Sequence, residues 1–196
     1  MKENQVQQDL ASIRNLMERS SKFISLSGLS GILAGIYALI GSAFIYWNSY
    51  FPMQSEPDRA SVIIIAAVVL LASVITGIVL SARKAKRKGQ QIWGPASRLL
   101  SFHMAGPLLT GGILIIIFFY KGNAGLAAPA SLIFYGLALL SASNFTFTDI
   151  KYLGLSEIAL GLIAAMYPGS SLLLWAFGFG VLHIVYGSIM YLKYDR

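Results

Sequence analysis

The chain has 196 residues, of which 56% are hydrophobic and only 12% are charged. A soluble domain of this size carries about twice that charged fraction, so the composition favours a membrane protein. There is no cysteine, which excludes disulfides, thiolate metal sites and cysteine nucleophiles. The net charge of +7 is compatible with nucleic-acid binding. However, the Lys and Arg residues lie where they would set the orientation of a membrane protein. No nucleic-acid partner is therefore expected.

Residues 1–22 are polar and are predicted to form a cytoplasmic amphipathic helix. The apolar residues of this segment recur at spacings of four, three and four, and they are Val6, Leu10, Ile13 and Met17. This stripe lies either on the membrane surface or against the bundle. Alternatively, residues 4–20 dock a second copy or another protein. The segment has no apolar core, so a cleavable signal peptide is not expected.

Residues 23–196 are predicted to form one all-α transmembrane domain. Six apolar stretches reach or approach the roughly 20 residues that cross the hydrocarbon core of a bilayer. The predicted spans are 23–46, 60–82, 98–119, 126–146, 152–167 and 170–192. The fifth is short and is expected to reach the membrane surface through the turn at Tyr167, Pro168 and Gly169. The predicted fold class is therefore a polytopic membrane protein with six transmembrane helices.

The basic residues lie almost entirely on one side of this arrangement. Thirteen of the fifteen Lys and Arg residues precede the first span, follow the sixth, or lie in the loops on that same side. Only Arg59 and Lys121 lie on the other side. The positive-inside rule then places both termini in the cytoplasm. The basic loop that starts at Arg83 and ends at Lys88 is expected to contact anionic lipid.

Three segments that open apolar hairpins can be aligned with one another. They cover residues 21–36, 97–112 and 152–162. One glycine recurs in all three, at Gly35, Gly111 and Gly161, and a second apolar stretch follows each segment. This order predicts three pseudo-repeated hairpins, as in membrane proteins built by duplication. The alternative is that Gly- and Ser-rich apolar helices align by chance.

Three ionisable side chains fall inside the predicted spans, namely His103, Glu157 and His183. Ionisable groups are costly in a bilayer and therefore indicate function. Counted from the cytoplasmic ends of the spans, they lie at depths of about 8, 8 and 14 Å, in the inner half of the membrane. Glu157 and His183 belong to one hairpin and are expected to be within reach of each other. Ser101 and Tyr186 complete the candidate ligand- or ion-binding site.

Two functional hypotheses and one structural alternative follow for these residues. Two histidines and a carboxylate match zinc chemistry, so His103, Glu157 and His183 are candidate metal ligands, although they form no local motif. A histidine and a partly buried glutamate can also relay protons near neutral pH. In the structural alternative, each group satisfies a neighbouring hydroxyl or backbone group, or faces cytoplasmic water.

In the last hairpin, residues 152–191, glycines and one proline mark the helices and the turn: Gly154, Gly161, Pro168, Gly180 and Gly187. This pattern resembles one unit of the HdeD-like membrane proteins, a bacterial family linked to acid resistance. The resemblance implies six spans in three hairpins and a bacterial inner membrane, and it supplies no catalytic residues. The sequence ERSSKFISLSGLSG before and within the first span is similar to that of uncharacterised membrane proteins from Bacteroidetes-type bacteria.

The chain has no Walker A sequence, GxSxG elbow or dinucleotide-binding loop, so neither an enzymatic activity nor a cofactor is expected. The favoured function is that of a non-enzymatic inner-membrane protein of envelope or stress adaptation, with a polar cavity open to the cytoplasm. One alternative is a small transporter or channel for a proton, ion or solute. The other is an assembly partner that docks through its N-terminal helix.

Overall fold

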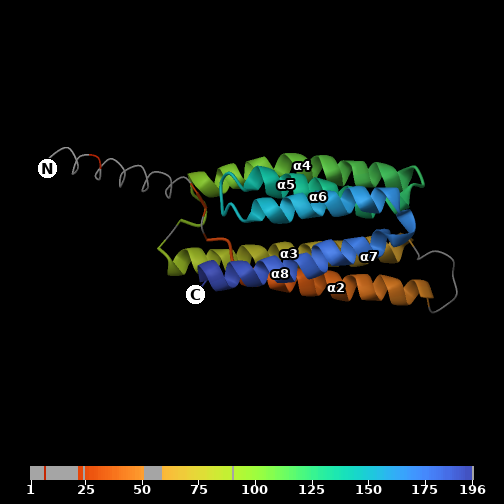
Figure 1. Cartoon of the computed structure of the whole chain (residues 1–196), viewed down its shortest axis with the longest axis horizontal. Coiled ribbons are helices and arrows are strands. Elements are labelled where there is room, and N and C mark those ends of the chain that lie inside the picture. Colours follow the sequence, from red (N-terminus) through yellow and green to blue (C-terminus); the bar gives the residue numbers. More distant parts are fainter. Residues whose placement is uncertain (1–6, 8–21, 24, 51–58, 90, 196) are drawn as a thin grey trace.

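A computed structural model describes residues 7, 22–23, 25–50, 59–89 and 91–195. The predicted N-terminal amphipathic helix therefore lies, apart from residue 7, outside the described residues. The secondary structure of the described part is entirely helical (Figure 1). The long helices are α2 (Gly28–Tyr50), α3 (Arg59–Arg87), α4 (Pro95–Tyr120), α5 (Ala127–Ala142) and α6 (Ile150–Met166).

The last helix is continuous but changes its winding along its length. It begins with a 3-10 turn (Pro168–Ser170) and continues as α7 (Ser171–Trp175), the π-helical segment η3 (Ala176–Leu182), α8 (His183–Met190) and the π-helical segment η4 (Tyr191–Asp195). We call the whole element, from Pro168 to Asp195, the C-terminal helix. A 3-10 turn (Ala124–Leu126) likewise precedes α5.

Five of the described helices are long and apolar enough to cross a membrane. They are Gly28–Asn48, Ala60–Arg87, Pro95–Tyr120, Ala124–Ala142 and Pro168–Asp195. Their length and hydropathy are those of a helical membrane protein. Helix α6 has 17 residues, fewer than the 19 of Ala124–Ala142, which is the shortest of these five.

The basic residues that follow the second apolar stretch are helical, which corrects the prediction of a loop there. Helix α3 continues to Arg87 and carries Arg83, Lys84 and Lys86 on its last turns. Lys and Arg are good helix formers, and positive charges are favourable at a helix C-terminus. The helix therefore continues beyond the last apolar residues of the span. Gly89, with a φ of 63°, lies just beyond the helix in the left-handed conformation that favours glycine.

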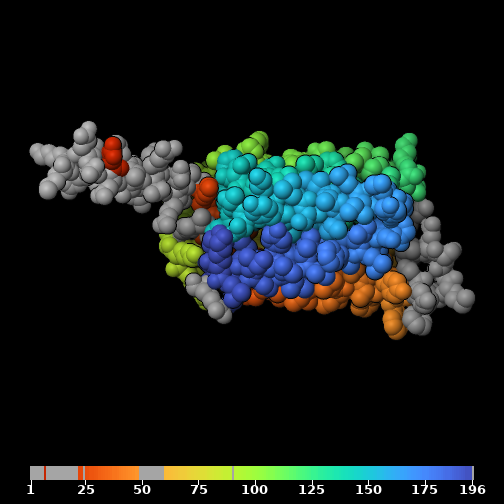
Figure 2. Space-filling view, in the orientation of Figure 1, coloured from red at the N-terminus to blue at the C-terminus, as the bar shows by residue number. Residues whose placement is uncertain are grey.

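The helices form two layers (Figure 1). One layer contains α4, α5 and α6, and the other contains α2, α3 and the C-terminal helix. The C-terminal helix packs mainly against α2, whereas α6 packs mainly against α5. Figure 2 shows α6 and the C-terminal helix side by side along one face of the molecule. The last two helices therefore belong to different layers, and the space between the layers holds the polar residues described below.

Glycines allow the closest helix contacts in both layers. A Cβ at Gly31 of α2 would lie 3.1 Å from the Cα of Gly187, and a Cβ at Gly35 would lie 2.6 Å from the carbonyl oxygen of Gly180. In the other layer, a Cβ at Gly136 of α5 would lie 2.5 Å from the carbonyl oxygen of Gly154. Small residues permit this approach where lipid supplies no hydrophobic driving force between helices.

The glycine shared by the three aligned segments lies at a helix interface each time, but against different partners. Gly35 faces the C-terminal helix, whereas Gly111 and Gly161 both face α5, at Phe134 and at Ile133. Sequence similarity among the three segments is thus not accompanied by one common mode of packing.

Candidate functional site: a buried glutamate, histidine and tyrosine

Glu157 lies in the middle of α6 and is completely buried, with 0% of its surface exposed. Neither of its carboxylate oxygens has a hydrogen-bond partner by distance and angle among the described residues. The absence of a side chain at Gly178 makes room for this carboxylate, since a Cβ there would lie 2.6 Å from Oε2. An ionised carboxylate in such surroundings is strongly disfavoured unless something compensates its charge.

His183 provides the group nearest to this carboxylate. It begins α8 on the C-terminal helix and is 6% exposed. Its Nδ1 atom lies 3.4 Å from Oε1 of Glu157 and 3.1 Å from the carbonyl oxygen of Gly178. The expectation that the two residues can reach each other is met in the structure.

Tyr135 of α5 is the third member of the cluster. Its hydroxyl lies 2.9 Å from Nε2 of His183, on the side of the imidazole opposite Glu157. The rings of Tyr135 and Phe179 pack with their centroids 5.0 Å apart, and the ring of Phe179 stacks on that of His183. We call Tyr135, Glu157 and His183 the buried triad. Its three side chains come from three helices and from both layers of the fold.

The backbone beside the triad is π-helical. The segment Ala176–Leu182 ends directly before His183 and includes Gly178, whose carbonyl accepts from the imidazole. Short π-helical segments are rare and frequently mark functional sites. Here the segment carries Gly178, which leaves space for Glu157, and His183 follows directly after it.

The other predicted site residues are not brought to the triad. His103 is exposed on α4, where its ring stacks on that of Phe145 with centroids 4.4 Å apart. Ser101 is also exposed on α4. Tyr186 is partly buried on α8, and its hydroxyl is within hydrogen-bonding reach of Ser156. Among the described residues, His103 therefore shares no hydrogen bond, ion pair or ring contact with Glu157 or His183.

The metal-site hypothesis finds no support in this arrangement. Catalytic zinc sites use three protein ligands, and structural sites use four. In the described part of the chain, no three His, Asp or Glu side chains gather closely enough to hold one metal ion. Of the three candidate ligands, only Glu157 and His183 lie close together, and His103 does not.

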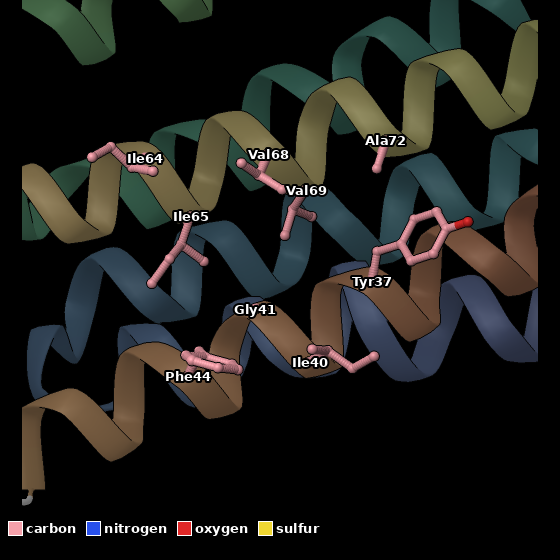
Figure 3. Close-up of a pocket in the computed structure, with 9 residues that line it drawn as sticks. All are labelled: Tyr37, Ile40, Gly41, Phe44, Ile64, Ile65, Val68, Val69 and Ala72. Carbon is pink, nitrogen blue, oxygen red and sulfur yellow. The ribbon is translucent and has the colours of Figure 1, made fainter.

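The sequence does not single out Tyr135, because no local pattern distinguishes it from the other tyrosines of the chain. Both Glu157 and His183 are buried, and the polar cavity open to the cytoplasm stays a prediction. A cavity of about 320 Å³ does lie between α2 and α3 (Figure 3). Its walls are apolar side chains such as Ile40 and Val68, together with Gly41.

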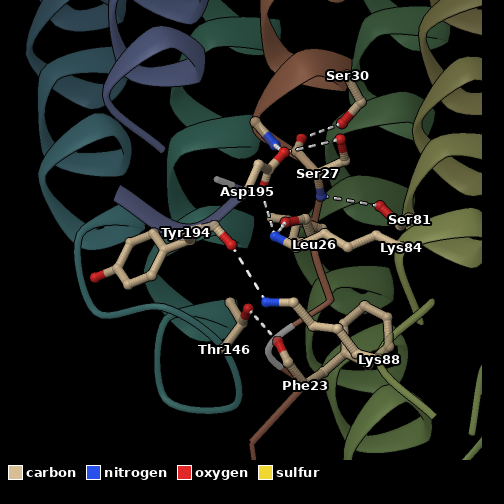
Figure 4. A network of polar contacts seen from close by, with 11 residues as sticks. Phe23, Leu26, Ser27, Ser30, Ser81, Lys84, Lys88, Thr146, Tyr194 and Asp195 are labelled. Carbon is tan, nitrogen blue, oxygen red and sulfur yellow. Dashed lines mark hydrogen bonds and ion pairs between the residues drawn. The ribbon is translucent and has the colours of Figure 1, made fainter. Parts of the chain in front are cut away.

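A second polar cluster joins the chain end to the start of α2 (Figure 4). The carboxylate of Asp195 accepts hydrogen bonds from the backbone N–H of Gly28 at 2.9 Å and from the hydroxyl of Ser27 at 3.3 Å. It also forms an ion pair with Lys84, and both side chains are about nine-tenths buried. A carboxylate at this position satisfies an unpaired backbone donor and interacts favourably with the helix dipole. This contact stabilises the bundle at the end that is predicted to be cytoplasmic.

A further ion pair lies beside this cluster, outside the apolar helices. Asp149 precedes α6, and its Oδ2 accepts hydrogen bonds at 2.8 Å from Lys193 and from the hydroxyl of Tyr194. These two donors hold the pKa of the Asp149 carboxyl below its ordinary value. The last residues of the chain therefore contact both the start of α2 and the start of α6.

No family model matches this chain, and neither a curated protein nor a solved structure is significantly similar to it. The composition and the five long apolar helices are compatible with the class of helical membrane proteins. The site described above is therefore interpreted from its own geometry.

Proposed function

We propose that this chain is a non-enzymatic bacterial inner-membrane protein of envelope or stress adaptation, and that its working site is the buried triad. One observation carries the proposal: Glu157 is completely buried in α6, has no hydrogen-bond donor among the described residues, and lies 3.4 Å from the imidazole of His183. An ionisable pair at such a place is costly and therefore indicates a function rather than a packing role. The bacterial setting rests on the resemblance of the last hairpin to HdeD-like proteins.

The proposed architecture has six spans in three pseudo-repeated hairpins, with both termini in the cytoplasm. Helix α6 is the additional span. Its 17 residues correspond to about 25 Å, and a short helix can be accommodated by local thinning of the bilayer. The distribution of Lys and Arg supports the orientation.

Membrane lipid is the principal proposed partner. Arg83, Lys86, Arg87 and Lys88 are exposed at the end of α3, where anionic headgroups can contact them. A homo-oligomeric or protein contact through residues 4–20 remains the proposal for the N-terminal helix. Deleting residues 1–20 should then remove a co-purifying partner and leave the bundle folded.

Substitution of the triad tests the proposed function directly. In a bacterium that depends on this protein under envelope stress, Glu157→Gln and His183→Ala should abolish the protection while the protein remains in the membrane at its normal level. His103→Ala is the matched control, because His103 is an exposed histidine outside the triad, and it should retain full protection. Full protection by both triad variants would overturn the proposal.

A second candidate function is a small transporter for a proton, ion or solute. Transporters bind their substrates near the bilayer midplane, and His183 lies close to the middle of the C-terminal helix, Pro168–Asp195. Purified protein in liposomes should then show a flux that Glu157→Gln removes and His103→Ala leaves unchanged. The absence of flux in the wild type would leave the first candidate in place.

A further inference from the structure

The charge of Glu157 needs a partner, and the surroundings restrict what that partner is. Within the part of the chain that the structure describes, the titratable groups in contact at the triad are its own members, from α5, α6 and the C-terminal helix. A Cβ at Gly178 would meet both the carboxylate of Glu157 and the apolar side chain of Leu132. Only a bound cation, a positively charged His183 or a proton on Glu157 can therefore remove the cost of a bare carboxylate.

A metal or alkali cation fits the surroundings poorly. Hard cations in proteins take about six oxygen ligands. Besides its own two oxygens, Glu157 has near it the carbonyl oxygen of Gly178, which already contacts Nδ1 of His183 at 3.1 Å. The remaining choice is where a single proton resides: on the carboxyl of Glu157 or on the imidazole of His183.

The two hydrogen bonds of the imidazole decide between these places. The carbonyl oxygen of Gly178 can only accept, so Nδ1 of His183 must carry a hydrogen and donate it. The hydroxyl of Tyr135 contacts Nε2 at 2.9 Å. It donates its hydrogen there if His183 is neutral, but it can only accept if His183 is positively charged. In the second case the hydroxyl hydrogen of Tyr135, a partly buried residue, loses its acceptor at the imidazole, which leaves this donor unsatisfied.

We propose that the buried triad is a binding site for one proton, held on the carboxyl of Glu157 beside a neutral His183, and that Tyr135 orients this imidazole by donating a hydrogen bond to its Nε2. This inference rests on the proposed function, since it names the ligand of the same site. Atoms and charge balance in a simple way. Glu157 takes up one proton at a carboxylate oxygen, and the triad changes from a net charge of −1 to neutral.

Tyr135 acts on this site through His183 and does not touch Glu157, so it is a positioning residue. Its substitution by phenylalanine retains the ring that packs on Phe179 and removes only the hydroxyl. Without the hydroxyl, Nε2 of a neutral His183 loses its hydrogen-bond donor. A charged His183 would instead carry an unpaired N–H at the same place, which costs more, so the proton should stay on Glu157.

The test is spectroscopic and uses the purified full chain in lipid nanodiscs at neutral pH. Infrared spectroscopy with ¹³C-labelled glutamate reports whether Glu157 carries a proton, with Glu157→Gln identifying its band. ¹⁵N NMR of labelled histidine reports the protonation of His183, with His183→Ala identifying its signals. We expect the wild type to show a protonated Glu157 and a neutral His183 with its hydrogen on Nδ1.

Tyr135→Phe should leave the carboxyl band of Glu157 in place and move the ¹⁵N signal of Nε2 to that of an imidazole nitrogen without a hydrogen-bond donor. Tyr186→Phe is the matched control, because Tyr186 lies on the same helix as His183 but contacts Ser156, and both spectra should stay as in the wild type. An ionised Glu157 in the wild type, or an unchanged Nε2 signal in Tyr135→Phe, would overturn the inference. Because no stress phenotype is measured, the inference can fail while the proposed function stands, and the reverse also holds.

Discussion

Asp195 caps Gly28: the carboxylate of the next-to-last residue accepts a hydrogen bond of 2.9 Å from the first backbone N–H of α2. Residues 167 positions apart in the chain are thereby joined at one end of the bundle. The same carboxylate neutralises Lys84 at the end of α3. Three of the helices in one layer therefore share a single anionic group.

This contact predicts that Asp195→Asn destabilises the bundle. The amide oxygen of asparagine can still accept from Gly28, so the loss comes mainly from Lys84, which is left buried without its counter-ion. Unfolding in detergent mixtures measures the free energy. The double variant Lys84→Met with Asp195→Asn should be less destabilised than the sum of the two single variants, because the unpaired charge is then absent. Additive losses would contradict the ion-pair explanation.

The glycine contacts between α2 and the C-terminal helix predict that Gly187→Ala is destabilising. The added Cβ would lie 2.6 Å from the backbone nitrogen of Ile32, and backbone atoms cannot rotate away. Forced separation of packed helices typically costs about 1–3 kcal/mol. The matched control is Gly77→Ala on α3, where a Cβ meets nothing within 4 Å. This variant should be neutral or slightly stabilising, because alanine favours helix. Equal stability of the two variants would contradict the packing described here.

The ion pair of Asp149 predicts a loss of stability in acid. Lys193 and Tyr194 lower the pKa of this carboxyl in the folded protein. Its contribution is therefore complete above the unfolded-state value of about 3.9. It is lost as the pH falls through the lower folded-state value. Melting temperatures of the wild type and of Asp149→Asn should differ at pH 6 and converge below about pH 4. A difference that persists in strong acid would show that the contact acts by packing alone.

The proposed six spans predict the side of the membrane on which each turn lies. Alkaline phosphatase is active only outside the cytoplasm, so a fusion after Gly169 should be active and a fusion after Arg196 should be inactive. If α6 did not cross the membrane, both results would be reversed, because the C-terminal helix would then start in the cytoplasm. A fusion after Asn144 is the control. It should be inactive in either case.

The class of the protein could be predicted from local sequence, because hydropathy over about 20 residues reports directly whether a helix is stable in lipid. The short fifth span was also visible in this way, since the turn at Pro168 limits its length. The end of α3 was misplaced by the same criterion. Hydropathy marks where apolar residues end, whereas Arg83 and Lys84 continue the helix through propensity and the helix dipole.

The composition of the site was only partly accessible to sequence reasoning. Glu157 and His183 were identified because an ionisable residue in a span is conspicuous anywhere, and their shared hairpin placed them within reach. Tyr135 carries no such signal, because tyrosine is tolerated in many membrane environments. His103 carries the same signal as His183 but faces outward, and only the rotation of α4 about its own axis determines that.

The sequence by itself determined that the chain is a helical membrane protein, where its apolar helices lie and which ionisable residues enter them, since each of these properties depends on neighbours in the chain. Only the tertiary structure decided which helices pair. The C-terminal helix packs on α2 while α6 packs on α5, and this division places Tyr135, Glu157 and His183 together. The physical reason is that helix pairing in lipid depends on close backbone contact at glycines such as Gly136 and Gly187. Which helix packs against such a glycine depends on how the surfaces of all the helices fit together.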